Sequence, residues 1–182
     1  MSETFRITQV TSLLHSYVFD VERRLVEHDG TTFERDVVTH AGAVSILAIN
    51  ERDEVGLLRQ YRAPFDEYVL EIPAGTLDVT DEEPLAAAKR DLREELGGDA
   101  KSWRLLGRFK VSPGWTNQVM TIFEARDITM VQRQPEGPEE RSSLIEWVPI
   151  RRLKETLARE TTNDYTLMVA LHRVFGNFFD DD

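Results

Sequence analysis

The sequence contains no cysteine, which excludes disulfide bonds and thiol chemistry. Positive charge is also scarce, because 22 lysines and arginines stand against 33 aspartates and glutamates, for a net charge of −11. A chain this acidic is a poor partner for a nucleic-acid backbone or an anionic membrane. A phosphate-bearing ligand would therefore need a local basic patch or a bound cation.

Two further absences bear on class and location. No apolar run approaches the length of a membrane-spanning helix, and the opening segment Met-Ser-Glu-Thr-Phe-Arg lacks the pattern of a signal peptide. We therefore expect a cytoplasmic protein. No low-complexity tract is present, and 182 residues of which 41% are hydrophobic predict one globular domain, with or without an N-terminal extension.

The N-terminal segment is expected to form two or three polar-rich strands. Residues 17–21 and 32–38 alternate apolar and polar side chains on either side of a turn signal at 29–30, which predicts a hairpin. A hairpin cannot bury both of its faces by itself. We therefore expect residues 1–40 to be an appendage that caps the main domain, formed by residues 41–182, or that reaches a partner subunit.

The main domain begins with two buried strands. Residues 42–50 are almost continuously apolar, which is typical of a central strand covered on both faces. A second apolar run, residues 55–61, follows a polar turn, and the two runs predict a hairpin at the centre of a mixed sheet. The remaining predicted elements are strands at 103–111, 119–125 and 144–149, a polar loop at 127–141, and helices at 150–160 and 164–176.

Residues 84–98 predict a helix that carries a cluster of acids. Its apolar positions recur at the helical period and form one stripe: Leu85, Ala88, Leu92 and Leu96. Asp91, Glu94 and Glu95 lie together on the flank of that stripe, where like charges repel and Arg90 can neutralise only part of them. Mg²⁺ binds such carboxylates together with water and phosphate oxygens. The cluster is therefore either a metal site or a solvated helix face.

The spacing of this stretch resembles the Nudix box, which consists of Gly, five residues, Glu, seven residues, and then Arg-Glu-apolar-any-Glu-Glu-any-Gly-apolar. The matching residues are Gly75, Glu82, Arg90, Leu92, Glu94, Glu95 and Gly97. Three positions depart from the pattern: six residues precede Glu82, Asp91 replaces a Glu, and Gly98 replaces an apolar residue. The extra loop residue costs little. Asp91 matters more, because in the family this position binds metal and its shorter side chain could weaken the site or require a bridging water.

The resemblance implies an α/β (α+β) fold, with an α/β/α sandwich around a mixed β-sheet and the N-terminal strands as an appendage. It implies Mg²⁺-dependent hydrolysis, with Mn²⁺ as the alternative ion, of a nucleoside diphosphate linked to another group. Asp91, Glu94 and Glu95 would be the metal ligands, and Glu95, Glu94 and Arg90 would be the catalytic residues.

Two further motifs narrow the resemblance to the ADP-ribose pyrophosphatase branch of the family. They are Gln60-Tyr61-Arg62, followed by Glu71-Ile72-Pro73-Ala74-Gly75, and Ser112-Pro113-Gly114. In that branch the residue matching Arg62 contacts the diphosphate, the carbonyl matching Ala74 binds metal, and the Pro113-Gly114 loop contributes to the substrate site. The implied reaction converts ADP-ribose to AMP and ribose 5-phosphate. Without the resemblance, Arg62 would be interpreted as an ordinary strand-edge arginine.

The acids of the 127–141 loop fit the branch less well. Its members usually place one or two glutamates just before the last strand, but here Arg141 and Ser143 stand at those positions. Glu136, Glu139 and Glu140 are displaced along the loop. We expect Glu139 or Glu140 to be brought to the site, with a solvated position as the alternative for each.

The N-terminal strands offer candidates for binding adenine. An aromatic platform could come from Phe19, Phe33 or Tyr17, with Arg35 beside them, from the same subunit or from a partner. Members of the branch are commonly homodimers with exchanged N-terminal strands, so a homodimer is expected. Two alternatives remain open: a Nudix enzyme for another nucleotide sugar or dinucleotide, such as GDP-mannose, and a non-catalytic sensor that binds ADP-ribose.

Overall fold

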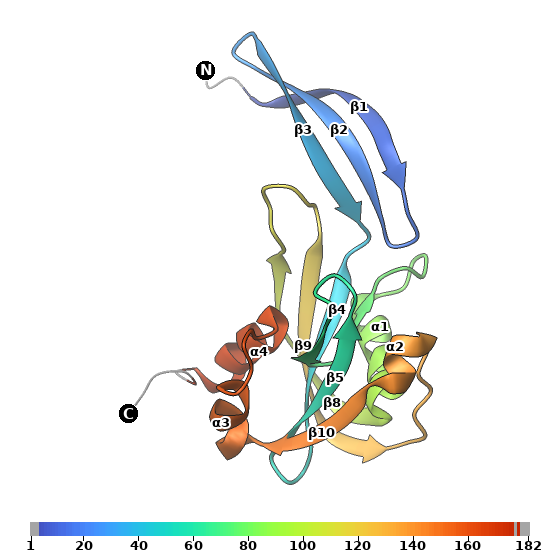
Figure 1. Cartoon of the computed structure of the whole chain (residues 1–182), viewed down its shortest axis with the longest axis vertical. Coiled ribbons are helices and arrows are strands. Elements are labelled where there is room, and N and C mark those ends of the chain that lie inside the picture. Colours follow the sequence, from blue (N-terminus) through green and yellow to red (C-terminus); the bar gives the residue numbers. More distant parts are fainter. Residues whose placement is uncertain (1–3, 177, 179–182) are drawn as a thin grey trace.

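The computed structural model describes residues 4–176 and 178, so the last part of the predicted main domain, 177 and 179–182, lies outside the described residues. A narrow N-terminal sheet extends away from a larger body made of a sheet with helices on both faces (Figure 1). In the part of the chain that the structure describes, no helix is long and apolar enough to cross a membrane.

The N-terminal sheet is antiparallel and has three strands in the order β1-β2-β3. Their bounds are β1 Arg6–His15, β2 Phe19–His28 and β3 Thr31–His40. The turn between β2 and β3 uses Asp29 and Gly30, both with positive φ (49° and 69°), as the turn signal predicted. Figure 1 shows the sheet joined to the main body only through its lower end.

The main sheet is mixed, and its principal strands follow the order β10-β5-β4-β9-β8. Two short strands pair off this path, β6 with β5 and β7 with β4. The bounds are β4 Ala43–Ile49, β5 Glu54–Arg62, β6 Glu67–Glu71, β7 Ala74–Thr76, β8 Gly98–Lys110, β9 Val119–Met130 and β10 Leu144–Pro149. Strand β4 is the most buried, and it pairs in parallel with β9 along its whole length.

Helices cover both faces of this sheet. Their bounds are α1 Pro84–Asp91, the π-helix η1 Leu92–Leu96, α2 Gly137–Ser142, the 3₁₀-helix η2 Ile150–Arg152, α3 Leu153–Leu157 and α4 Tyr165–Phe175. Figure 1 shows α3 and α4 on one side of the sheet and α1 with α2 on the other. Each face has its own apolar core, one against α3 and α4 and one against α1 and η1. The predicted α/β/α sandwich is confirmed.

Several boundaries differ from those predicted. The helix predicted at 84–98 is an α-helix followed by a π-helical turn, and it ends at Gly97, whose φ is 65°. The next strand starts at Gly98 instead of residue 103, because Gly98 already pairs with Met130 of β9. The predicted 127–141 loop therefore contains the end of β9 as well as α2.

The predicted central hairpin is also looser than expected. Strands β4 and β5 are neighbours in the sheet, but their ladder contains only Ile49 opposite Val55. The other end of β4 pairs with β7, through Ala43 to Ser45. The sequence analysis did not predict the short strands β6 and β7. Strand β7 pairs with β4, and β6 pairs with β5, at positions where a regular hairpin would have paired β4 with β5.

Candidate active site

The first part of the site is a close contact between β7 and the end of α1. A Cβ built on Gly75 would lie 2.2 Å from Oδ2 and 2.5 Å from Cγ of Asp91. Only glycine therefore allows the Asp91 carboxyl group to pack against this backbone. On the same strand, the Ala74 N–H donates a 3.2 Å hydrogen bond to Oε2 of Glu95. Asp91 and Glu95 therefore hold strand β7 against the helix.

Both acids are buried. Asp91 is 3% exposed and Glu95 is 6% exposed, whereas Glu94 is half-buried. The three residues span the junction of α1 with η1. A π-helical turn inside an α-helix is rare and is often found at functional sites.

Arg90 is surrounded by carboxylates. It pairs with Glu82 at 3.2 Å, with Oδ1 of Asp91 at 3.0 Å and with Oε2 of Glu94 at 3.2 Å. Glu82 is a box position whose partner the sequence analysis did not identify. Arg90 thus organises the acids, and its guanidinium has three carboxylate partners.

The remaining negative charge is under-compensated. Burial, together with the charges of Glu94, Glu82 and Glu140, raises the pKa of Asp91 to about 7, although Arg90 opposes the shift. Burial likewise raises the pKa of Glu94, and it raises the pKa of Glu95 well above its usual range, with Glu140 and Asp91 adding to the effect. Carboxyl groups that raise one another's pKa in this way favour binding of a cation.

The charge of an acid on the short helix α2 also acts on the cluster. The charge of Glu140 raises the pKa of Asp91, Glu94 and Glu95, whereas Glu139 acts on the pKa of Tyr61. Oε2 of Glu140 accepts a 2.6 Å hydrogen bond from the N–H of Glu136. Of the three displaced loop acids, Glu140 is therefore the one whose charge acts on all three box carboxyls.

The oxygen donors suit a divalent ion such as Mg²⁺, but they do not form a complete set of ligands. Within residues 4–176 and 178, no three Asp, Glu or His side chains converge closely enough to hold a metal by themselves. Mg²⁺ usually binds one or two carboxylates and completes its shell with water and substrate phosphates, so three converged side chains are not required. Oδ2 of Asp91 is buried and lacks a hydrogen-bond partner among the described residues, as an oxygen reserved for an ion would.

Arg62 lies beside the acids but is already engaged. Its Nε and Nη2 donate to the two carboxylate oxygens of Glu71 at 2.8 and 2.6 Å. The positive charge of Arg62 opposes the rise in the pKa of Glu95, so the two groups interact electrostatically. Arg62 and Glu71 line a cavity of about 510 Å³ between the β5–β6 turn and the start of α4, together with Phe65 and Tyr165.

The other predicted substrate residues lie apart from the acids in this single chain. Pro113 and Gly114 belong to the β8–β9 loop, which pairs with β3 through Val38 and Trp115. On the N-terminal sheet, Phe19 faces His40 at the lower end of the ladder. Tyr17 lies just before it and is 95% exposed.

Phe33 lies further out on the same sheet. It pairs with Val26, which puts it roughly 23 Å along the strands from Phe19 at about 3.3 Å per residue. The guanidinium carbon of Arg35 is 4.5 Å from the centre of the Phe33 ring. Phe19 and Phe33 therefore do not form one platform within a chain.

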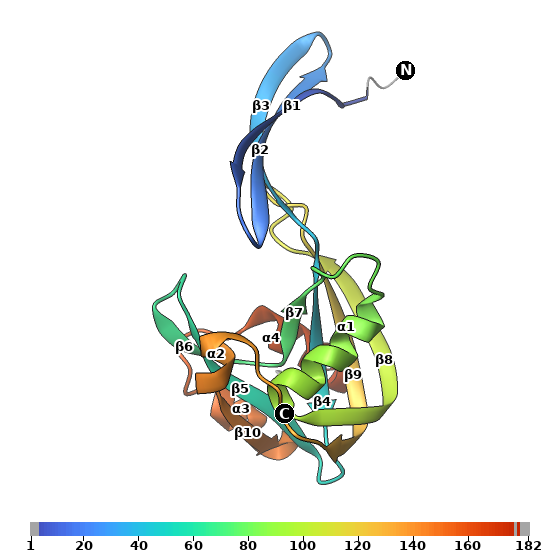
Figure 2. The same cartoon turned by 90° about the vertical axis from the view of Figure 1, so that its right-hand side faces the viewer.

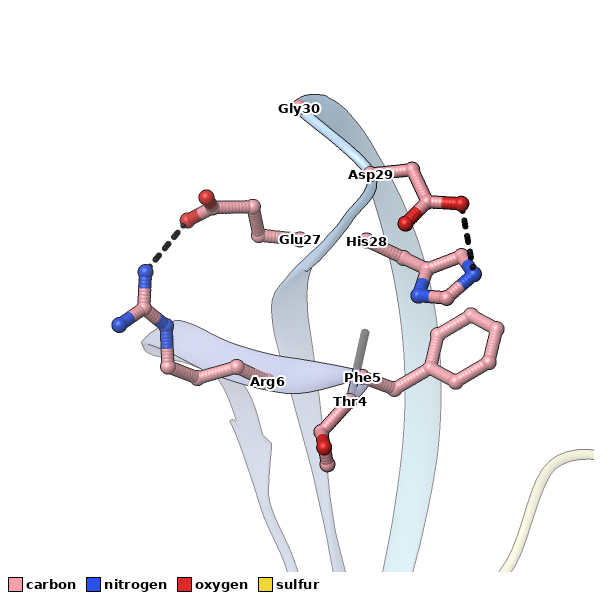
Figure 3. Close-up of a pocket in the computed structure, with 7 residues that line it drawn as sticks. All are labelled: Thr4, Phe5, Arg6, Glu27, His28, Asp29 and Gly30. Atoms are coloured by element: carbon pink, nitrogen blue, oxygen red, sulfur yellow. Dashed lines mark hydrogen bonds and ion pairs between the residues drawn. The ribbon is translucent and has the colours of Figure 1, made fainter. Parts of the chain in front are cut away.

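A pocket of about 420 Å³ lies at the far tip of the N-terminal sheet (Figure 3). Figure 3 shows Phe5 beside His28, and the two rings stack with centroids 3.8 Å apart. Arg6 pairs with Glu27 across the same pocket. Its lining residues come from the N-terminal sheet and the segment before it, at the end of the sheet that points away from the main body in Figure 1.

Comparison with known proteins decides the family. Residues 39–170 match the NUDIX domain. The chain belongs to the Nudix family. It is 32% identical over 152 residues to the ADP-ribose pyrophosphatase of Mycobacterium tuberculosis. The aligned region makes up 82% of this chain and 73% of that protein. The chain is 34% identical over 124 residues to the ADP-ribose pyrophosphatase of Bacillus subtilis, covering 68% and 64% respectively.

The Nudix fold is found along almost the whole chain. A crystal structure of an ADP compounds hydrolase superposes with a TM-score of 0.78 at 24% sequence identity. The match covers 97% of this chain and 96% of the chain in that structure. This chain is therefore a Nudix hydrolase, and Nudix hydrolases generally use divalent metals. The contact of Gly75 with Asp91 and the four partly or fully buried acids lie within this Nudix domain.

Proposed function

We propose that this Nudix hydrolase cleaves ADP-ribose to AMP and ribose 5-phosphate, using Mg²⁺ with Mn²⁺ as the alternative ion. The observations that carry the proposal are the close packing of the Asp91 carboxyl group against Gly75 and the hydrogen bond from the Ala74 N–H to Glu95. The charge of Glu140 from α2 also acts on the box acids. The two relatives named as ADP-ribose pyrophosphatases support the choice of substrate.

The carboxylates of Asp91, Glu94 and Glu95 and the carbonyl of Ala74 would hold the ion. When bound, a divalent ion neutralises diphosphate oxygens and lowers the pKa of water in its shell. Arg90 fixes the positions of the carboxylates through its ion pairs to Asp91 and Glu94. Gly75 leaves the space in which the Asp91 carboxyl group lies.

The chain's own groups account for the remaining steps. The carboxylate of Glu140 would accept a proton from the attacking water as the water oxygen bonds to one phosphorus. The bond from that phosphorus to the bridging oxygen breaks, and the bridging oxygen leaves with the other phosphate, which gives AMP and ribose 5-phosphate. Arg62 would turn from Glu71 to the substrate diphosphate, because a guanidinium fork matches phosphate oxygens as well as it matches a carboxylate. Positioning and charge stabilisation then supply most of the rate.

A substrate panel tests the proposal. The purified protein is incubated with Mg²⁺ and ADP-ribose, GDP-mannose or a dinucleoside diphosphate, and the products are separated by chromatography. AMP and ribose 5-phosphate should form, with kcat/KM highest for ADP-ribose. A higher kcat/KM on GDP-mannose would reassign the substrate. Tight calorimetric binding of ADP-ribose in Mg²⁺ without AMP formation would identify a sensor instead of an enzyme.

We further propose that two copies associate through their N-terminal sheets, as the exposure of β1 supports. Every described residue of β1 is exposed, and the sheet presents a run of large apolar side chains to solvent: Ile7, Val10, Leu13, Leu14, Val18 and Phe19. Apolar exposure on this scale usually marks an interface. The N-terminal sheet of the second copy would bring Phe19, Phe33, Tyr17 or Arg35 to the adenine. These residues would then lie near Pro113 and Gly114 of the first copy.

A further inference from the structure

Arg133 joins the two segments that carry the acids. It lies between β9 and α2 and is half-buried. Its Nε donates a 2.5 Å hydrogen bond to the backbone carbonyl of Glu95, at the end of the box helix. Its Nη2 donates to the carbonyl of Glu140 at 2.7 Å and to Oγ of Ser143 at 2.6 Å. One guanidinium therefore spans the gap between Glu95 and Glu140.

The helix side of this connection is built around the end of η1. The last carbonyls of a helix have no partner within the helix, and a cation there is favoured by the helix dipole. Arg133 satisfies the Glu95 carbonyl, and the N–H of Val131 donates to the Gly97 carbonyl at 2.7 Å. Gly97 has a φ of 65°, and a Cβ there would lie 2.8 Å from the Val131 carbonyl oxygen. The segment at 131–133 is thus packed directly against the helix end.

The α2 side is equally specific. Ser143 is 7% exposed, and its hydroxyl both accepts from Arg133 and donates to the Glu140 carbonyl at 2.8 Å. Ser143 therefore ties the Arg133 guanidinium to the last turn of α2, next to Glu140.

We infer that Arg133 is a positioning residue that holds α2, and with it Glu140, against the end of the box helix at Glu95. The catalytic consequence rests on the proposed function, whereas the structural consequence does not. The role needs arginine, because three acceptors in different directions suit the fixed fork of a guanidinium and exceed what one ammonium group can hold in place. Sequence reasoning missed this residue because its acceptors are two carbonyls and a hydroxyl from segments that meet only in the fold.

The kinetic test compares Arg133→Gln, Arg133→Lys and Arg133→Ala with the control Arg173→Ala. Arg173 also donates to a backbone carbonyl, that of Leu106, but on the α4 side of the sheet. Arg133→Gln should lower kcat on ADP-ribose by about 10–100-fold with KM within about 3-fold, since a misplaced group of about 1 Å can cost this much. Arg133→Lys should retain an intermediate rate, and Arg173→Ala should keep the wild-type kcat.

The inference is overturned if Arg133→Gln and Arg173→Ala keep equal kcat, or if only KM changes. Ser143→Ala serves as a second variant, because it removes one acceptor and leaves the other two. It should lower kcat by less than about 10-fold, and it keeps the inference testable if the Arg133 variants fold poorly.

Hydrogen exchange separates this inference from the proposed function. In Arg133→Gln, amides of residues 137–143 should lose protection relative to wild type, while amides of α4 stay unchanged. Unchanged protection at 137–143 would overturn the inference even if ADP-ribose is hydrolysed. Conversely, lost protection in a protein that hydrolyses none of the panel substrates would uphold the role of Arg133 and reject the proposed function.

Discussion

The main domain and the N-terminal sheet of this chain are stabilised very differently. Within the described residues, every buried hydrophobic side chain lies between Ala43 and Leu171, in the two cores of the main domain. The N-terminal sheet buries none and leaves β1 exposed along its length. Figure 2 shows the upper part of this sheet standing clear of the domain, whose β8–β9 loop meets only its lower end.

Ion pairs do not make up for the missing core of the N-terminal sheet. Its pairs, such as Arg6 with Glu27 and Arg23 with Asp36, are solvent-exposed, and exposed pairs contribute only about 0–1 kcal/mol each. The main domain, by contrast, buries the neighbouring carboxyl groups of Asp91 and Glu95. The main domain thus has its own apolar cores, whereas the N-terminal sheet has an exposed surface that the proposed association of two copies would cover.

The largest expected effect tests the acids of the domain. Glu95→Gln should lower kcat on ADP-ribose by about 10²–10⁴-fold, because it removes a carboxylate of the proposed metal site, while the melting temperature should stay level or rise slightly. The matched control is Glu124→Gln, a buried glutamate on β9 that pairs with Arg104 and Arg126. The control should lower the melting temperature and keep kcat. Wild-type turnover in Glu95→Gln would disprove the metal-site assignment.

The next effect concerns the N-terminal sheet. Charges on one face of the sheet, in the double variant Ile7→Lys and Val10→Lys, should weaken dimerisation by at least about 10-fold and raise KM for ADP-ribose. Ile7 pairs with Val26 and Val10 with Arg24, so the two side chains share a face. Sedimentation and steady-state kinetics measure the two quantities. Thr11→Lys adds the same charge at an exposed polar position on the opposite face of β1 and is the control. A monomeric wild type with normal turnover would show that the domain needs no partner.

A stability effect follows from the raised pKa of Asp91, about 7 in the folded chain against an ordinary value of 3.8. Between about pH 4 and pH 7 the folded state holds a proton that the unfolded state releases, so the free energy of unfolding falls as pH rises, by up to about 4 kcal/mol. Chemical denaturation without metal should show this decline in wild type and a smaller one in Asp91→Asn.

Metal addition should reverse that decline. Mg²⁺ binds the deprotonated acids of the folded state, so at about pH 8 it should raise the stability of wild type more than that of Asp91→Asn. An equal response of the two proteins to Mg²⁺ would contradict a role for Asp91 in ion binding.

The smallest effect is expected for Asp91→Glu, which restores the residue typical of the family. Its activity should rise or stay level, because the longer side chain reaches the ion directly. Steady-state kinetics with an Mg²⁺ titration measures the change. A loss of more than about 10-fold would mean that the close packing against Gly75 has adapted to aspartate.

The sequence predicted the features that depend on local patterns. The apolar stripe through Leu92 and Leu96, the stop at Gly97 and the turn at Asp29-Gly30 all depend on residue type and spacing, and the structure has each of them. The layered fold followed from the resemblance carried by the box. These signals lie within a few residues of one another.

The features that the sequence did not predict depend on distant partners. Strand β7 exists because Ala74 to Thr76 pair with β4, and nothing in three residues reveals that. The pairing of Arg62 with Glu71 and the three bonds of Arg133 likewise join segments that only the fold brings together. The link from Glu140 through Arg133 to the box helix depends on helix α2, which the polar composition of the predicted loop did not reveal.

The most direct test is a crystal structure grown with Mn²⁺ and a non-hydrolysable ADP-ribose analogue. We predict an anomalous peak within about 2.0–2.3 Å of carboxylate oxygens from Glu95 and its neighbours and of the Ala74 carbonyl, with the diphosphate completing the shell. A bound analogue with no ion between these residues, or with the carboxylates of Asp91, Glu94 and Glu95 directed away from it, would contradict the account.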